Sequence, residues 1–124
     1  MNTQQIANRL VELCREGKYD ECYDELFAAE AENIEMPAMA DGPLGNAKGL
    51  EAIRAKAKAW SDGVEQIHGG SVGEPQVSGN WFSVPMSMDL TFKGKGRMAM
   101  EELCVYQVRD GKIVREQFFY DTGS

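Results

Sequence analysis

Residues 97–121 read RMAMEELCVYQVRDGKIVREQFFYD, and the fold class follows from this stretch. Asp110-Gly111 is a two-residue turn signal between two runs rich in apolar and aromatic residues, which predicts a β-hairpin. In the register of such a turn, Val108 lies opposite Ile113. One face then carries Tyr106, Cys104, Ile113 and Phe119, and the other carries Val105, Leu103, Val114, Phe118 and Tyr120. Because both faces are largely apolar, both need to be covered.

The chain before this hairpin predicts further strands of the same sheet. Apolar residues from Phe82 to Phe92 alternate with polar or small ones, and Lys93–Gly96 is typical of a turn. Residues 64–77 predict a weak strand that is bent or bulged by its glycines. The second half of the chain therefore predicts a four-strand antiparallel meander. A separate short strand is expected at Asn33–Met36.

The first half of the chain predicts three helices. Apolar residues recur at helical spacing over Ile6–Cys14, Tyr19–Phe27 and Leu50–Trp60. The expected class is α+β, with three N-terminal helices packed on one face of the antiparallel sheet. The other face is then expected to meet a second copy of the chain in a two-fold homodimer. A strongly curved sheet that wraps over its own helices is the alternative.

Composition and charge narrow the classes of function. The 124 residues suit a single domain, 1–124, and 13 Lys and Arg against 20 Asp and Glu give a net charge of −7. Without a basic arm, nucleic-acid binding is not expected. No stretch is long and apolar enough to span a bilayer, and the first residues lack the pattern of a secretion signal. We therefore expect no membrane association and a cytoplasmic location.

Residue types that bind metals are sparse. The three cysteines are widely spaced without a CxxC motif, His68 is the single histidine, and no calcium-loop motif occurs. Neither a metal nor a cofactor is expected. The one basic cluster lies in or beside the third predicted helix and is interpreted as a solvated helix face. It comprises Lys48, Arg54, Lys56 and Lys58.

Five segments, in this order along the chain, carry a resemblance to a known family. They are Gly17–Asp20, Ile34–Pro37, Gly49–Ile53, Val108–Val114 and Phe118–Asp121. The chain resembles the nuclear transport factor 2-like (cystatin-like) superfamily, and within it the SnoaL-like and ketosteroid-isomerase-like small domains. The resemblance implies a strongly curved sheet that forms a cone around a mostly apolar pocket, usually in a homodimer. It implies no particular reaction, because this fold hosts enzymes and binding domains alike.

The catalytic positions of ketosteroid isomerases can be carried over one at a time. The proton-transferring carboxylate before the proline of the first strand corresponds to Met36. The tyrosine of the first helix corresponds to Leu10, and the protonated aspartate of the next-to-last strand falls near Cys104. Leucine and methionine donate no hydrogen bond, and a thiol is a weak donor. The sequence therefore disfavours ketosteroid-type isomerisation, and whether the chain is an enzyme stays open.

The catalytic residues of the limonene epoxide hydrolases and the SnoaL-like cyclases are also only partly matched in this chain. The last-strand aspartate of the limonene epoxide hydrolases corresponds to Phe118, and the pocket tryptophan before it corresponds to Glu116. A SnoaL-like cyclase needs a buried acid–base carboxylate. Asp121, Glu116 and Glu102 are all candidates for that position.

Glu102, Glu116 and His68 are the candidate catalytic residues. Burial of a carboxylate on an apolar strand raises its pKa toward a range useful for acid–base chemistry, and histidine titrates near neutrality without help. The alternative is that the glutamates face solvent or pair with Arg97, Arg109 or Arg115, and that His68 is a surface or core residue. The two-residue turn places Glu102 and Glu116 on opposite faces unless a bulge intervenes.

Large apolar and amphipathic side chains are the candidate ligand contacts: Tyr106, Phe118, Tyr120, Met36, Met86 and Trp60. Core packing is the alternative for each. The sequence thus favours an apolar conical pocket that binds a small apolar or amphipathic molecule. The alternatives are an acid–base enzyme of the cyclase, isomerase or hydrolase type, and an interaction domain whose exposed sheet binds another protein.

Overall fold

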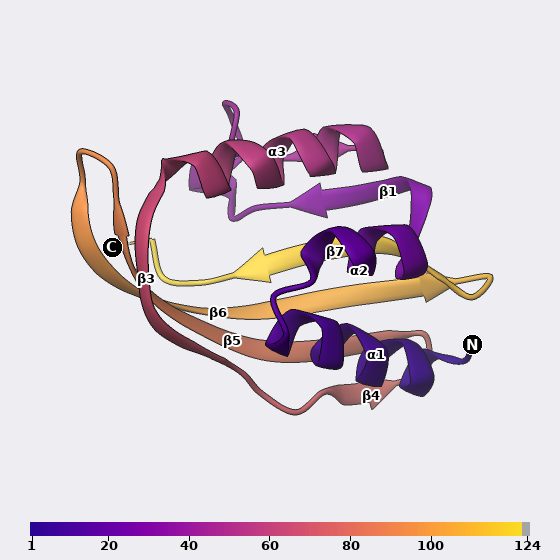
Figure 1. Cartoon of the computed structure of the whole chain (residues 1–124). Coiled ribbons are helices and arrows are strands. Elements are labelled where there is room, and N and C mark those ends of the chain that lie inside the picture. Colours follow the sequence, from indigo (N-terminus) through magenta and orange to yellow (C-terminus); the bar gives the residue numbers. More distant parts are fainter. Residues whose placement is uncertain (123–124) are drawn as a thin grey trace.

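The computed structural model describes residues 1–122 and contains helices packed on one sheet (Figure 1). The helices are α1 Thr3–Arg15, α2 Tyr19–Leu26 and α3 Leu50–Gly63, with a 3₁₀ turn, η1, at Pro37–Met39. The strands are β1 Phe27–Ile34, β2 Ala47–Lys48, β3 Val64–Val72, β4 Gln76–Ser78, β5 Trp81–Phe92, β6 Gly96–Arg109 and β7 Lys112–Phe119. The predicted α+β class is confirmed.

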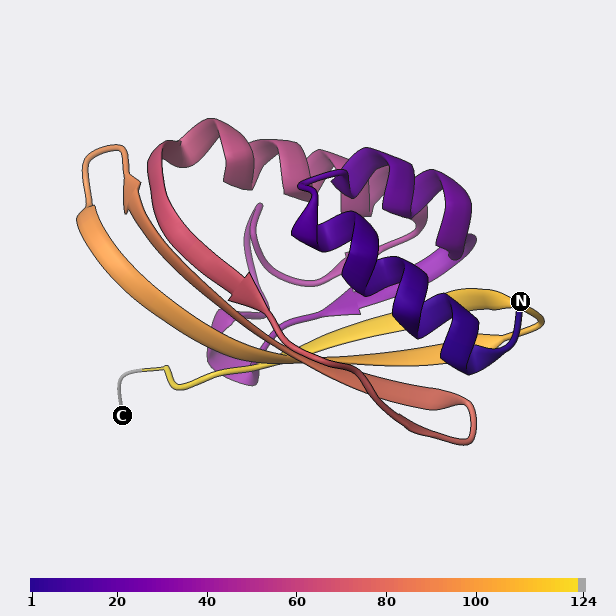
Figure 2. The same cartoon turned by 60° about the horizontal axis from the view of Figure 1, so that its bottom comes forward.

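The sheet has the strand order β2-β1-β7-β6-β5-β3, and β4 extends the pairing of β5. It curves strongly, and the three helices lie on its concave face (Figure 2). The predicted meander of β3 to β7 is present, but it is only part of the sheet. β1 adds to it by pairing parallel with β7, and β2 pairs antiparallel with β1.

The core lies between the helices and the concave face. Asn2 caps α1 through a reciprocal pair of hydrogen bonds with Gln5, and the helix buries an apolar stripe against the sheet. In the sheet, the rings of Phe82 and Tyr106 stack with centroids 4.7 Å apart. The side chains of Ile6, Leu10, Ile53 and Ile113 are essentially inaccessible to solvent. This packing fixes the concave face on which the candidate site is built.

The first strand begins earlier than predicted. β1 starts at Phe27, directly after α2, instead of at Asn33. Its alanines and glutamates are good helix formers, so local propensity predicts no strand here. Pairing with β7 overrides this preference, because β1 buries Phe27, Ala31 and Asn33 against the core. Asn33 is thereby placed inside the sheet and not at the start of a strand.

The glycine-bent strand behaves as predicted. β3 shows two register shifts against β5, between Val64 and Gln66 and between Ile67 and Gly69. At Gly70 a Cβ atom would lie 2.7 Å from the backbone oxygen of Ser87, so only glycine fits this close approach. The strand then breaks before β4. These features bend the edge of the sheet toward the helices.

A bulge in the last hairpin corrects the predicted faces. The turn at Asp110-Gly111 is confirmed, with Val108 opposite Ile113, but Gln107 is opposite Arg115, so β7 contains one extra residue. Every later residue of β7 is therefore shifted to the other face. The structure pairs Tyr106 with Glu116, Cys104 with Phe118 and Leu103 with Phe119. The predicted faces of Phe118 and Phe119 were wrong, as was the placement of Glu102 and Glu116 on opposite faces.

Candidate functional site

Glu116 is a carboxyl side chain buried on the concave face, with 7% of its surface exposed. It comes from β7, two residues after the bulged segment, and faces Tyr106 of β6. Burial raises the pKa of Glu116 to about 7, because an ionised carboxylate loses its water there. Hydrogen bonds from Tyr106 and Asn33 and the charge of Lys56 act in the opposite direction, and the charge of Glu102 adds to the rise.

Asn33 and Lys56 connect this carboxyl to the third helix. The Asn33 amide donates from Nδ2 to Glu116 Oε1 at 2.7 Å. The Asn33 Oδ1 atom accepts a hydrogen bond from the Lys56 ammonium. Lys56 lies on α3 with only 13% of its side chain exposed, 5.5 Å from the ring centroid of Phe118. Lys56 was predicted to be solvated; this was wrong, because the residue lies three positions after the buried Ile53 and shares its inward face.

Glu35 and Tyr120 continue the network toward the surface. Lys56 Nζ lies 2.5 Å from Glu35 Oε2, and the Tyr120 hydroxyl donates to Glu35 Oε1 at 2.5 Å. The Glu35 side chain is nine-tenths buried. Desolvation, followed by the hydrogen bond and charge of Glu35, raises the pKa of Tyr120, so its hydroxyl stays protonated and remains a donor. Five side chains thus form one continuous hydrogen-bonded chain: Glu116, Asn33, Lys56, Glu35 and Tyr120.

Glu102 is the third carboxyl of this cluster. It lies on β6 opposite Met86, and the Cys104 thiol donates to its Oε1 atom at 3.5 Å. Burial is the main cause that raises the pKa of Glu102, and the charge of Glu35 adds to it. The Cys104 hydrogen bond and the charge of Lys56 lower it. The last pair between β6 and β7 at this end of the hairpin is Leu103 with Phe119. Glu102, the next residue of β6, therefore has no partner in β7.

The cluster brings several groups that can exchange protons close together. Three carboxyl groups, those of Glu35, Glu102 and Glu116, share the single ammonium of Lys56. Two of them have a raised pKa. Glu116, with a pKa of about 7, can both accept and return a proton at physiological pH. The cluster is therefore suited to acid–base chemistry.

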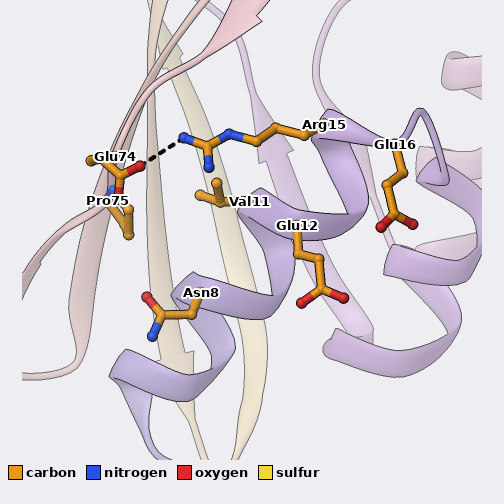
Figure 3. Close-up of a pocket in the computed structure, with 7 residues that line it drawn as sticks. All are labelled: Asn8, Val11, Glu12, Arg15, Glu16, Glu74 and Pro75. Atoms are coloured by element: carbon orange, nitrogen blue, oxygen red, sulfur yellow. Dashed lines mark hydrogen bonds and ion pairs between the residues drawn. The ribbon is translucent and has the colours of Figure 1, made fainter.

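A cleft of about 420 Å³ meets this cluster at the sheet edge where β7 ends. Glu102, Met86 and Tyr120 line it, together with the apolar side chains of Leu103, Phe119 and Pro85. Glu102 and Tyr120 are thus the members of the cluster that border an opening to solvent. A second hollow of about 500 Å³ lies between α1 and residues 74–75, where Arg15 pairs with Glu74 at 2.8 Å (Figure 3). It contains none of the candidate residues.

The structure brings together most of the residues predicted from the sequence. Glu102, Glu116, Tyr106, Phe118, Tyr120 and Met86 all belong to the cluster or its cleft. Met36 touches its edge, because its backbone hydrogen-bonds to Tyr120. Trp60 lies apart, with its ring edge-to-face against Phe92 at 5.8 Å.

His68 is not part of this cluster. It is exposed on β3, where its Nε2 atom lies 2.7 Å from Thr91 Oγ1. Its charged neighbours are Asp89 and, through Asp89, Arg97, which are ion-paired at 2.9 Å. The predicted arginine partners of the glutamates are also used elsewhere: Arg97 binds Asp89, and Arg115 donates to Gln117 at 3.1 Å.

Sequence reasoning missed Asn33, Lys56 and Glu35. Asn33 and Glu35 both lie in the short strand predicted at Asn33–Met36, but the sequence did not show that this segment lies beside β7, where Asn33 meets Glu116. Lys56 gave the clearest signal: it lies three residues after Ile53 and four before Trp60, beside the apolar stripe of its helix. A lysine at such a position either extends its ammonium to solvent or binds a carboxylate in the interior.

These features identify a curved-sheet cone with an acidic interior, and the comparisons give its family. The chain belongs to the SnoaL-like domain family, whose sequence pattern matches residues 1–120. The solved structures give the same fold. A Mesorhizobium loti protein named as a SnoaL-like polyketide cyclase is 33% identical, with a TM-score of 0.88 over 97% of this chain and 100% of that one.

Two more distant structures contain small molecules. TerC, co-crystallised with polyporic acid, is 16% identical with a TM-score of 0.72 over 95% of this chain and 90% of its own. A Catenulispora acidiphila protein with a ketosteroid-isomerase-like fold, in complex with trimethylamine, is 18% identical with a TM-score of 0.70 over 99% and 90%. No curated protein matches the chain.

Two further findings concern classes of function. Across residues 1–122, no helix is long and apolar enough to cross a membrane. Within the same residues, no group of three or more His, Cys, Asp and Glu side chains is arranged to hold a metal ion.

Proposed function

We propose that this SnoaL-like domain is an acid–base enzyme that transfers a proton to or from a small organic molecule bound at the cleft of Glu102 and Tyr120. The observation that supports this proposal is the placement of Glu102, with its raised pKa, between the cleft and the buried cluster of Glu116, Asn33 and Lys56. A raised pKa makes the ionised carboxylate of Glu102 a stronger base than an ordinary glutamate.

The roles follow from the chemistry of each side chain. Glu102 removes a proton from a carbon next to a carbonyl group and returns it at another atom of the substrate. The negative charge that develops on the carbonyl oxygen needs a hydrogen-bond donor. Tyr120 lines the same cleft and stays protonated, and its single O–H, which donates to Glu35 in the structure, would turn to the substrate oxygen to supply this hydrogen bond. The apolar walls of Met86, Leu103 and Phe119 would hold the body of an amphipathic substrate.

The family relatives support a small-molecule substrate. Two structures of this fold hold polyporic acid and trimethylamine, respectively. The relative that is 33% identical is named as a polyketide cyclase, and cyclisation of a polyketide begins with proton removal next to a carbonyl group. We extend this to the chain as a substrate class, compounds with an acidic C–H bond between carbonyl groups.

Solvent deuterium exchange tests the proposal without knowledge of the natural substrate. A panel of 1,3-dicarbonyl compounds is incubated with the protein in D₂O, and incorporation is followed by NMR. We expect exchange above the buffer rate, lost in Glu102→Gln by a factor of about 10² or more. Glu65→Gln, an exposed carboxylate on β3, is the matched control and keeps the wild-type rate. Equal rates in wild type and Glu102→Gln would refute the proposal.

Ligand binding without turnover is the second candidate. It is favoured by the residues at the isomerase positions: Leu10 and Cys104 are buried in the core and Met36 is apolar. A probe that binds with measurable affinity, but exchanges no faster than in buffer alone, would support this reading over catalysis.

We also propose a homodimer through the convex face of the sheet. Leu103 and Phe119 lie opposite each other there, each 42% exposed, and Trp81 is 41% exposed. Among the buried side-chain nitrogen and oxygen atoms of the described residues, only Nε of Arg115 lacks a hydrogen-bond partner. A second copy over this face would cover the apolar side chains and narrow the cleft from outside.

A further inference from the structure

We propose that Lys56 is a positioning residue that controls the protonation of Glu116 by fixing the orientation of the Asn33 side-chain amide. The inference deepens the proposed function and rests on it in one respect, that Glu116 belongs to the cluster around Glu102. The geometry that supports it is the chain from Lys56 through Asn33 to Glu116.

The amide of Asn33 has two unlike ends. Its Oδ1 atom only accepts hydrogen bonds, and its Nδ2 atom only donates them. The Lys56 ammonium only donates, so it can bind Oδ1 and not Nδ2. With Oδ1 held by Lys56, Nδ2 faces Glu116 and donates to it at 2.7 Å.

A donor facing Glu116 favours the ionised carboxylate, which is the stronger acceptor. If the amide were flipped, Oδ1 would face Glu116 and would be satisfied only by a protonated carboxyl group. Lys56 excludes this flipped state as long as it is charged and in place. It is itself held in place by Glu35 at 2.5 Å, and Glu35 by Tyr120 at 2.5 Å. Lys56 therefore acts on Glu116 through Asn33 as well as through its charge.

The other groups around Glu116 do not provide this control. Tyr106 on β6 faces it directly, and Glu102 and Cys104 lie on the same strand. From the helices, α2 contributes Cys22 and Tyr23, and Cys14 of α1 neighbours Tyr106. Burial keeps the tyrosines and Cys104 in their neutral forms, because it raises the pKa of each. Lys56 is the one cation in this set, and Asn33 the one group whose two orientations favour opposite protonation states.

The test is an NMR titration of the Glu116 side chain in a double-mutant cycle. Lys56→Met and Asn33→Leu should each raise the Glu116 pKa by about one unit. Because the charge of Lys56 also acts directly on Glu116, the double variant should titrate above Asn33→Leu, but by less than the sum of the two single shifts, whereas independent effects would add fully. Lys56→Arg should restore the wild-type titration. Lys58→Met, on the exposed face of the same helix, is the control and leaves it unchanged.

If Lys56→Met or Asn33→Leu does not fold, NMR of the wild-type protein tests the inference instead. The two Asn33 amide protons should shift with pH at the same midpoint as Glu116. A Glu116 titration that Lys56→Met does not move, fully additive shifts in the cycle, or Asn33 protons that ignore the Glu116 midpoint would each overturn the inference. Deuterium exchange lost in Glu102→Gln would then still stand as evidence for the proposed function, so the two can fail separately.

Discussion

Glu116 lies opposite Tyr106 because β7 contains one residue more than the strand it pairs with. Without this bulge, Glu116 would face the convex side and Glu102 would be alone inside the cone. The extra residue therefore assembles the candidate site, because it places both glutamates on the face that also receives Asn33 from β1 and Lys56 from α3.

The raised pKa of Glu116 makes stability depend on pH. The folded protein binds this proton up to about pH 7, while the unfolded chain releases it near the ordinary glutamate pKa of 4.5. The folded state therefore binds more protons in this window, and the free energy of unfolding falls as pH rises from about 4.5 to 7. One pKa unit corresponds to about 1.4 kcal/mol, so the loss is of order 3 kcal/mol.

Glu116→Gln tests this dependence directly. Glutamine keeps the shape and a carbonyl oxygen for Asn33 but cannot ionise. We expect urea unfolding at pH 8 to show the variant at least as stable as the wild type, and a flatter pH profile between 4.5 and 7. A profile identical to that of the wild type would mean that Glu116 titrates normally in the folded protein.

Tyr120→Phe removes the hydroxyl that Glu35 binds and that borders the cleft. We expect deuterium exchange to slow by roughly tenfold or more, as for the loss of a donor to a developing oxyanion. Unfolding should change by only about 1 kcal/mol, the net worth of one hydrogen bond. Wild-type exchange in this variant would remove Tyr120 from the proposed machinery.

Leu103→Lys tests the proposed dimer. The substitution introduces a charge among the exposed apolar side chains of the convex face, at a residue that also lines the cleft. Sedimentation should show a dimer for the wild type and a monomer for the variant, with circular dichroism unchanged. A wild-type monomer at micromolar concentration would contradict the proposal.

Much of the fold can be predicted from the periodicity of apolar residues. The two features that were predicted wrongly, the start of β1 and the register of β7, share a cause. The helices, the turn at Asp110-Gly111 and the bends in β3 are local features that sequence patterns record. β1 and the bulge depend on pairing between distant segments. Alanine-rich β1 becomes a strand only against β7, and one inserted residue leaves no local signature in an apolar run.

The residues of the candidate site likewise fall into those that the sequence could predict and those that it could not. Glu102 and Glu116 could be predicted because a carboxylate inside an apolar strand is costly and therefore conspicuous. Asn33, Glu35 and Lys56 look like ordinary surface residues until β1 and α3 are placed over β7. Their contacts with Glu116 and with one another form only when β1, β7 and α3 pack together.

The pH dependence of deuterium exchange tests the central claim most directly, that Glu102 is the base. The exchange rate of the best 1,3-dicarbonyl probe should rise with pH through a midpoint above the ordinary range of glutamate, because burial raises the Glu102 pKa. The same midpoint should appear in the NMR titration of Glu102, and the profile should be lost in Glu102→Gln. A profile that survives in Glu102→Gln, or no exchange above buffer at any pH, would contradict the account.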